Sequence, residues 1–141
     1  MIYVERMGDK MGLDMFLYGV EYHSEYDEDN DKSYYVMTKE IYWRKANQIH
    51  RWFVENIQHN IDNCAMYYVS KRSLCELKEL CEKVLEDKKL ANELLPVGRG
   101  FFFGSVEYDE WYFKDLEYTV EKLDELLKNE KYDFYKYQSD W

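Results

Sequence analysis

Residues 42–58, YWRKANQIHRWFVENIQ, decide how the rest of the chain can fold. The apolar side chains of this stretch recur at intervals of three and four positions: Ala46, Ile49, Phe53 and Ile57. This spacing is the period of one face of a helix. Trp43 and His50 extend the same side. The stretch therefore predicts an amphipathic helix over 42–58 with its apolar face on the core.

Two more helices are predicted further along, each after a residue suited to cap it. Ser70 precedes KRSLCELKELCEKVLED (71–87), and Asp109 precedes a helix that continues to about Leu127. Their apolar faces repeat with helical spacing: Leu74, Leu77, Leu80 or Cys81, and Val84 in one, and Tyr112, Leu116, Val120, Leu123 and Leu127 in the other. A further turn, ANELL, stops at Pro96, which cannot continue a helix.

Short strands are predicted between the helices because aromatic and β-branched residues cluster there: LDMFLYGVEY (13–22), YYVM (34–37), AMYYVS (65–70), FFF (101–103) and YDFYKYQSDW (132–141). The acidic segment 22–33 lacks apolar periodicity and is expected to be an exposed, mobile loop. Residues 1–11 are interpreted as an N-terminal extension, with Met11 as an alternative start. We expect one α+β domain over 1–141, with about three helices packed on a short-stranded, mostly antiparallel sheet.

Composition supports a folded domain with a very polar surface. The 141 residues are 46% apolar and 34% charged, and 18% are aromatic, with fifteen tyrosines. A disordered chain would be poor in aromatic residues. Three cysteines, an odd number, and the lack of a signal-like or membrane-spanning apolar run predict a reduced protein of the cytoplasm.

The formal net charge of −10 bears on partners. It argues against direct nucleic-acid binding and against anionic membranes, which need a basic surface. It permits an acidic surface that docks on a basic protein. The segment 38–72 differs in charge from the rest of the chain, since it holds six basic residues and three acidic ones. We call this segment the positive island, and it is the first candidate for an anion-binding site.

Several segments together resemble a group of small bacteriophage and prophage proteins: MGLDMFLY, YWRKANQIHRWFVENIQ, ELLP, GFFFGSVEYDEWYFKDLEYT and the terminal YQSDW. The resemblance spans most of residues 12–141 and departs at the N-terminus, where ten residues precede MGLDM. It brings no biochemical function with it, so no residue inherits a role. It implies a phage accessory protein in the cytoplasm of a bacterial host, where small acidic proteins act against host defences.

The predicted helix over 42–58 carries the main candidate site. Arg44, Asn47 and Arg51 lie three or four positions apart and would form one polar stripe, beside Trp43 and His50. Arginine offers a planar fork for phosphate, asparagine can read a base edge, and tryptophan can stack. These types suit a nucleotide-like ligand. The alternative is an ordinary solvated helix face with its tryptophans in the core.

GRGFFFGS, residues 98–105, is the second candidate. Glycines on both sides of a strand allow close backbone approach, and Arg99 and Ser105 would bracket a ligand there. It lacks the spacing of a phosphate-binding loop, so a tight turn that leads into a buried strand is the alternative.

His50 is interpreted first as a hydrogen-bonded residue near the core, then as an anion contact, and last as a general base.

No metal or cofactor is expected. Glu107, Asp109 and Glu110 are explained by capping of a helix N-terminus, and the cysteines lack zinc-site spacing.

We expect a non-enzymatic protein that sequesters a small anionic, nucleotide-like signal of host defence. The alternative is an inhibitor, anti-CRISPR-like and mimicking nucleic acid, that presents an acidic, tyrosine-rich surface to a host protein. A small nucleotide-processing enzyme using His50 comes third. The aromatic content is compatible with a homodimer.

Overall fold

The computed structural model describes residues 12–27, 30–98 and 107–141. The elements in chain order are β1 (Asp14–Asp27), β2 (Asn30–Arg44), α1 (Asn47–Asn56), β3 (Tyr67–Val69), α2 (Lys71–Glu86), the 3-10 helix η1 (Lys88–Leu90), α3 (Ala91–Leu94), α4 (Glu110–Lys128) and β4 (Phe134–Asp140). The strands form one antiparallel sheet in the order β2-β1-β4-β3. The predicted α+β class is confirmed. The candidate strand 101–103 lies outside the described residues.

Both predicted helix caps are present. The Ser70 hydroxyl accepts a hydrogen bond from the backbone N–H of Ser73 at 3.1 Å, and α2 begins at the next residue. The Asp109 carboxylate accepts from the backbone N–H of Tyr112 at 3.0 Å at the start of α4. Each cap satisfies a donor that the first helical turn leaves without an intrahelical partner.

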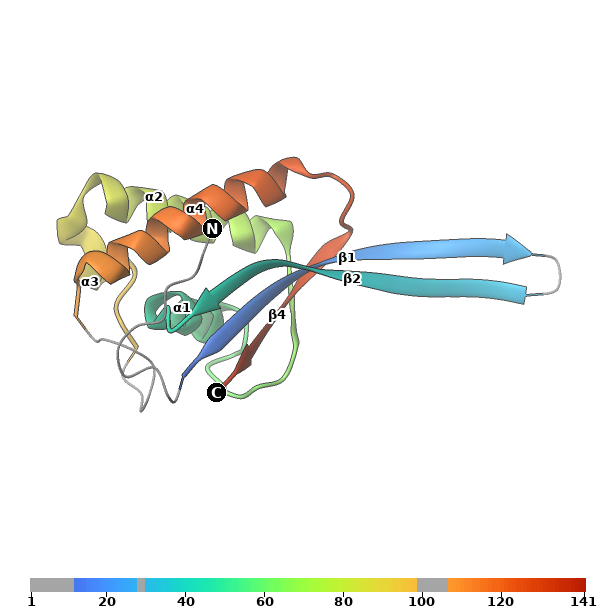
Figure 1. The fold of residues 1–141 in the computed structure, drawn as a ribbon, viewed down its shortest axis with the longest axis horizontal. Coiled ribbons are helices and arrows are strands. Elements are labelled where there is room, and N and C mark those ends of the chain that lie inside the picture. The colour runs from blue at the N-terminus through green and yellow to red at the C-terminus, as the bar shows by residue number, and fades with distance from the viewer. Residues whose placement is uncertain (1–11, 28–29, 99–106) are drawn as a thin grey trace.

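The helices pack on one face of the sheet (Figure 1). Trp43 of β2 shows this, because its ring meets Phe53 of α1 at 6.0 Å and its indole N–H donates to Thr119 of α4 at 2.8 Å. Phe53 also stacks on Tyr137 of β4, with ring centroids 3.8 Å apart. The core thus lies between this sheet face and α1, α2 and α4. Among the described helices, none has the length and apolar character that crossing a membrane requires.

The helix predicted over 42–58 begins later than expected, at Asn47. Residues 42–44 continue β2 instead, with Trp43 opposite Met15 of β1. Alternation explains the difference, since Ile41 and Trp43 both point into the core from a strand. The apolar residues from Trp43 onward show helical spacing because the end of β2 and helix α1 both direct apolar side chains into the same core.

Where the structure describes it, the acidic segment 22–33 forms strands and is not a loop. Residues through Asp27 belong to β1 and those from Asn30 belong to β2, paired in continuous antiparallel register. Strand β4 stops pairing with β1 at Val20, so from Glu21 outward the two strands have only each other. This ribbon, residues 21–27 and 30–36, is called the arm, and it projects from the body (Figure 1).

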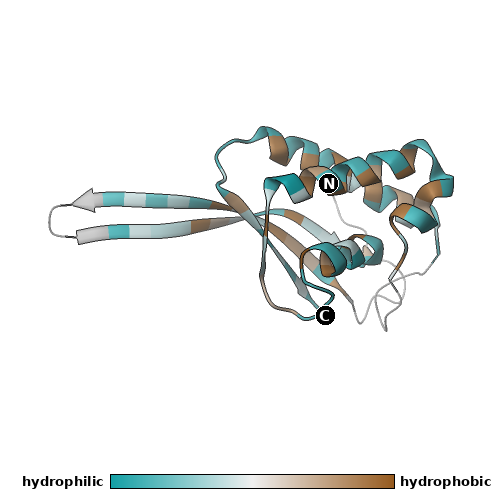
Figure 2. Cartoon of the chain, turned by 180° about the vertical axis from the view of Figure 1, so that it is seen from behind, coloured by the Kyte–Doolittle hydropathy of each residue, from teal (hydrophilic) through white to brown (hydrophobic). Residues whose placement is uncertain are grey.

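Cross-strand contacts explain why the arm forms without apolar periodicity. The rings of His23 and Tyr34 stack at 5.2 Å, the Tyr22 hydroxyl donates to Ser33 at 2.9 Å, and Glu25 lies opposite Lys32. Such pairs stabilise a two-stranded ribbon. Figure 2 shows the outer arm in teal and pale colours, whereas apolar segments are concentrated in the body.

Gly19 lies where no side chain fits. A Cβ atom at this position would lie 2.5 Å from the ring of Tyr132, which is itself buried. We expect Gly19→Ala to lower the free energy of unfolding by about 1–3 kcal/mol, because overpacking forces the ring or the strand to move. Denaturant unfolding measures this. In a Tyr132→Ala background the same substitution should cost much less; an equal cost in both backgrounds would contradict the steric explanation.

Candidate functional site

The predicted site residues gather around the junction between β2 and α1. Arg44 ends β2, and Lys45 has a φ of 55°, an uncommon conformation for a residue with a side chain. The backbone N–H of Lys45 donates to the carbonyl of Leu13 at 2.7 Å. This bond ties the junction to the start of β1, so the reversal from strand to helix is held in one geometry.

Buried polar side chains are concentrated at this junction and along α1. Among the described residues, seven polar side chains are buried, and five of them lie between positions 45 and 58: Lys45, Asn47, Gln48, His50 and Gln58. Burying a polar group without a hydrogen bond costs about 1–3 kcal/mol. Buried polar groups need hydrogen-bond partners in the protein or in a ligand. We therefore take the junction and α1 as the candidate site.

Asn47 and Arg51, one turn apart on α1, both bond to the backbone at positions 97 and 98. The Asn47 side-chain oxygen accepts from the backbone N–H of Gly98 at 3.1 Å, and the Arg51 guanidinium donates to the carbonyl of Val97 at 3.2 Å. Arg51 also donates to Glu55 at 2.7 Å. These bonds hold α1 against the residues just before the glycine-rich segment. Arg99 and Ser105 of that segment lie outside the described residues.

The N-terminal end of α1 is cationic. Its first turn holds no acidic residue, and no side chain caps it. Lys45 and Arg44 precede it, and both lie against Gly12, where a Cβ would be 3.0 Å from the Lys45 Cε and 3.3 Å from an Arg44 terminal nitrogen. Asp14 lies opposite Arg44 in the sheet. Two basic residues therefore directly precede, in the chain, the positive end of the helix dipole.

Two residues that were predicted to contact a ligand, Trp43 and Arg44, do not occupy the predicted positions. Trp43 is 2% exposed, with its ring in the core, so the expectation that it offers a stacking surface is wrong. Arg44 is not on the helix stripe with Asn47 and Arg51, because it belongs to β2. Helical spacing placed these residues together, whereas the strand gives Trp43 and Arg44 opposite faces.

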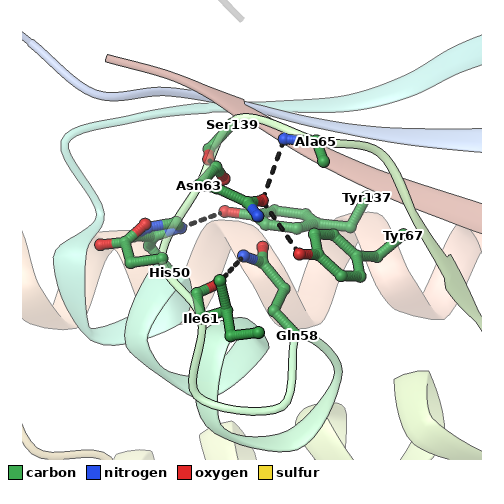
Figure 3. A network of polar contacts seen from close by, with 9 residues as sticks. His50, Gln58, Ile61, Asn63, Ala65, Tyr67, Tyr137 and Ser139 are labelled. Carbon is green, nitrogen blue, oxygen red and sulfur yellow. Dashed lines mark hydrogen bonds and ion pairs between the residues drawn. The ribbon is translucent and has the colours of Figure 1, made fainter.

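His50 is at the centre of a buried hydrogen-bond network (Figure 3). Its Nδ1 lies 2.7 Å from the Tyr137 hydroxyl, and its Nε2 lies 2.8 Å from a carboxylate oxygen of Asp62. A carboxylate only accepts, so Nε2 carries the proton and donates to Asp62. The neutral ring then accepts the Tyr137 O–H at Nδ1, which agrees with the first interpretation of His50, a hydrogen-bonded residue near the core.

Burial sets the protonation state of this ring. Desolvation lowers the pKa of His50 from its ordinary value, although the hydrogen bond and charge of Asp62 act in the opposite direction. Burial also raises the pKa of Tyr137 well above its ordinary value, so the hydroxyl remains a donor. With both ring nitrogens engaged, His50 fixes the segment around Asp62 to α1 and β4.

That connecting segment is itself held by side-chain bonds to its backbone. The Gln58 amide donates to the Ile61 carbonyl at 2.8 Å, and the Asn63 side-chain oxygen accepts from Ala65 N–H and the Tyr67 hydroxyl (Figure 3). Sequence reasoning missed Asp62 and Tyr137 as partners of His50. Only the Asn-rich composition of 56–63 hinted at ordered turns, and Tyr137 is 87 positions away.

Comparisons with protein-family models, with curated proteins and with solved structures found no match to this chain.

The His50 network predicts a pH dependence of stability. Because the folded pKa is lowered, the unfolded chain binds more protons once the pH falls below about 6.5. Stability should therefore be full above that pH and fall as the pH decreases toward the lowered value. His50→Gln should remove up to one proton from this slope in denaturant unfolding between pH 7.5 and 5. A slope in His50→Gln equal to that of the unsubstituted protein would contradict the assignment.

Proposed function

We propose that this chain is a non-enzymatic binding protein that sequesters a small anionic, nucleotide-like ligand at the N-terminal end of α1. The observation that carries the proposal is the set of buried polar side chains at this end, Lys45, Asn47 and Gln48, with no acidic residue in the first helical turn. The resemblance to phage proteins suggests the setting, in which removing a host defence signal benefits the phage.

The helix end offers the chemistry that a phosphate group needs. The first backbone N–H groups of a helix point outward, and the helix dipole favours negative charge there. Lys45 is only 6% exposed, and a charge in such a low-dielectric position attracts an anion more strongly than one in water. Arg44 adds a second cation, and its guanidinium can bind a phosphate with two donors.

The remaining buried polar residues form hydrogen bonds within the protein, and these bonds hold α1 in place. Gln48 donates to the carbonyl of Tyr112 at 3.1 Å and so joins α1 to α4. Asn47 holds Gly98. His50 uses one nitrogen for Asp62 and the other for Tyr137. A general base needs a free nitrogen near its substrate, so this geometry supports binding over catalysis.

A thermal-unfolding panel of mono-, di- and cyclic nucleotides tests the proposal. A ligand at 100 times its Kd stabilises by about 2.7 kcal/mol, which should raise Tm by about 5–15 °C for a domain of this size. Lys45→Met should abolish the shift because it removes the buried charge and keeps the side-chain length. Lys71→Met, at the start of α2 in the same positive island, is the matched control and should keep it.

Arg44→Gln provides an independent variant if Lys45→Met is unstable. Loss of the shift in either variant, with the control unchanged, supports the proposed site. A panel with no shift for the wild-type protein, or a shift that survives both substitutions, would reject it. A ligand recovered chemically altered would instead favour the enzyme.

The arm favours a second candidate function, the blocking of a basic host protein. Segment 21–32 contains six acidic residues and one lysine. Aromatic and apolar side chains on the β2 strand of the arm are also exposed: Tyr34, Tyr35 and Val36 at 45%, 61% and 37%. Exposed tyrosines are enriched at protein interfaces, and a thin acidic ribbon could occupy a groove that normally binds nucleic acid. This observation supports docking on a basic surface.

Charge neutralisation tests the arm. We expect Glu21→Gln with Glu25→Gln to weaken binding to a basic nucleic-acid-binding host protein by about 2- to 30-fold at low salt, given 0.2–1 kcal/mol for each exposed charge. Biolayer interferometry against a panel of purified host proteins measures this. The matched control is Glu76→Gln with Glu82→Gln on exposed positions of α2. Equal weakening by both pairs would indicate a net-charge effect and exclude a specific role for the arm.

A further inference from the structure

The sheet has a second face, opposite the helices, and aromatic side chains cover much of it. No described helix lies across this face (Figure 1), because Trp43, Phe53 and Tyr137 place α1 and α4 on the other. Several large side chains here are well exposed: Tyr22 at 48%, Tyr35 at 61%, Met37 at 45% and Tyr68 at 63%. Exposed apolar surface of this extent signals a binding surface.

One row of this face alternates cations and aromatic rings across all four strands. Lys39 of β2 lies opposite Tyr18 of β1, Tyr18 lies opposite Lys136 of β4, and Lys136 lies opposite Tyr68 of β3. Residues directly opposite one another share a face. We call Lys39, Tyr18, Lys136 and Tyr68 the Lys–Tyr row. Their flanking residues Leu17, Tyr135, Tyr137 and Val69 are buried on the helix side.

The aromatic surface continues from the row toward the arm. Tyr68 meets Phe134 at 5.5 Å, Phe134 meets Tyr35 at 5.8 Å, and Tyr35 meets Tyr22 at 5.4 Å between ring centroids. On the other side of the row, the Lys39 ammonium lies 4.3 Å from the centre of the Phe16 ring. The row is thus one part of a connected set of rings.

The row is locally cationic although the chain carries a net charge of −10. It contributes two lysines and no carboxylate. The carboxylates that share the face at the strand ends, Asp14 and Asp140, lie opposite each other and two same-face positions away from Tyr18 and Lys136. The acidic residues Glu21 and Glu25 belong to the opposite face of the arm, by strand alternation. An anion approaching the row therefore meets positive charge first.

We propose that the Lys–Tyr row binds a short single-stranded oligonucleotide. Its bases would stack on Tyr18 and Tyr68, and its phosphates would contact Lys39 and Lys136. The two tyrosines lie two strands apart, roughly 10 Å, and four-stranded sheets that bind RNA stack bases on exposed rings in this way. Net charge predicted no nucleic-acid binding, and the row is a local exception that limits the site to a few nucleotides. It is separate from the α1 site.

Fluorescence anisotropy with a labelled hexathymidylate in low salt tests the proposal. We expect binding that a duplex of equal length does not reproduce, because paired bases cannot stack on the sheet. Tyr68→Ala should weaken it about 5- to 150-fold, and the edge position of this exposed residue leaves the core intact. With two phosphate contacts, the logarithmic salt slope should be about −1.4, and Lys39→Gln should reduce it by about 0.7.

The controls are Tyr34→Ala, a tyrosine exposed on the other face of the arm, and Arg72→Gln, an exposed cation on α2. Neither should change the affinity, and the α1 variant Lys45→Met should not change it either. Absence of binding at millimolar protein, or equal binding by Tyr68→Ala, would overturn the proposal. So would a wild-type dimer in sedimentation equilibrium that Tyr68→Ala dissociates, since a second copy would then occupy the face.

Discussion

Tyr137 makes the contacts on which the rest of this structure depends. Its fully buried ring stacks on Phe53 of α1, and its hydroxyl donates to His50 one turn earlier on the same helix. Through His50 it also positions Asp62 and the segment that leads to β3. One side chain of β4 thus sets the place of α1, and with it the cationic end that the proposed ligand would contact.

Charge is divided among regions of the molecule, and the net value hides this division. The arm is acidic, the junction between β2 and α1 is basic and largely buried, and the Lys–Tyr row is basic, with Lys39 and Tyr68 exposed and Tyr18 and Lys136 partly exposed. Screening limits interactions between exposed charges to about 10 Å at moderate salt. Each region therefore presents its own sign to a partner, so one small domain can attract partners of opposite charge at different places.

The arm also carries features that oppose strand pairing between molecules. Beyond Val20 its strands pair only with each other, so neither outer edge has a neighbouring strand, although the Tyr22 N–H donates to the Asp133 carboxylate at 2.6 Å. Such edges promote strand pairing between molecules, and charged residues oppose it. The carboxylates of Glu21 and Glu25 act in this sense. Nearer the body, the edge of β2 is satisfied locally, since the Tyr118 hydroxyl donates to the carbonyl of Tyr42 at 2.8 Å.

The sequence alone determined the α+β class, the helices after Ser70 and Asp109 and the burial of Phe53, because capping and apolar periodicity act over a few residues. It did not reveal the arm, whose stability comes from pairing between strands, nor the start of α1 at Asn47. Only the tertiary structure decided which partners His50 has and which tyrosines align with Lys39 and Lys136. Those contacts join residues from distant parts of the chain, and they form only when strands far apart in the sequence pair in one register.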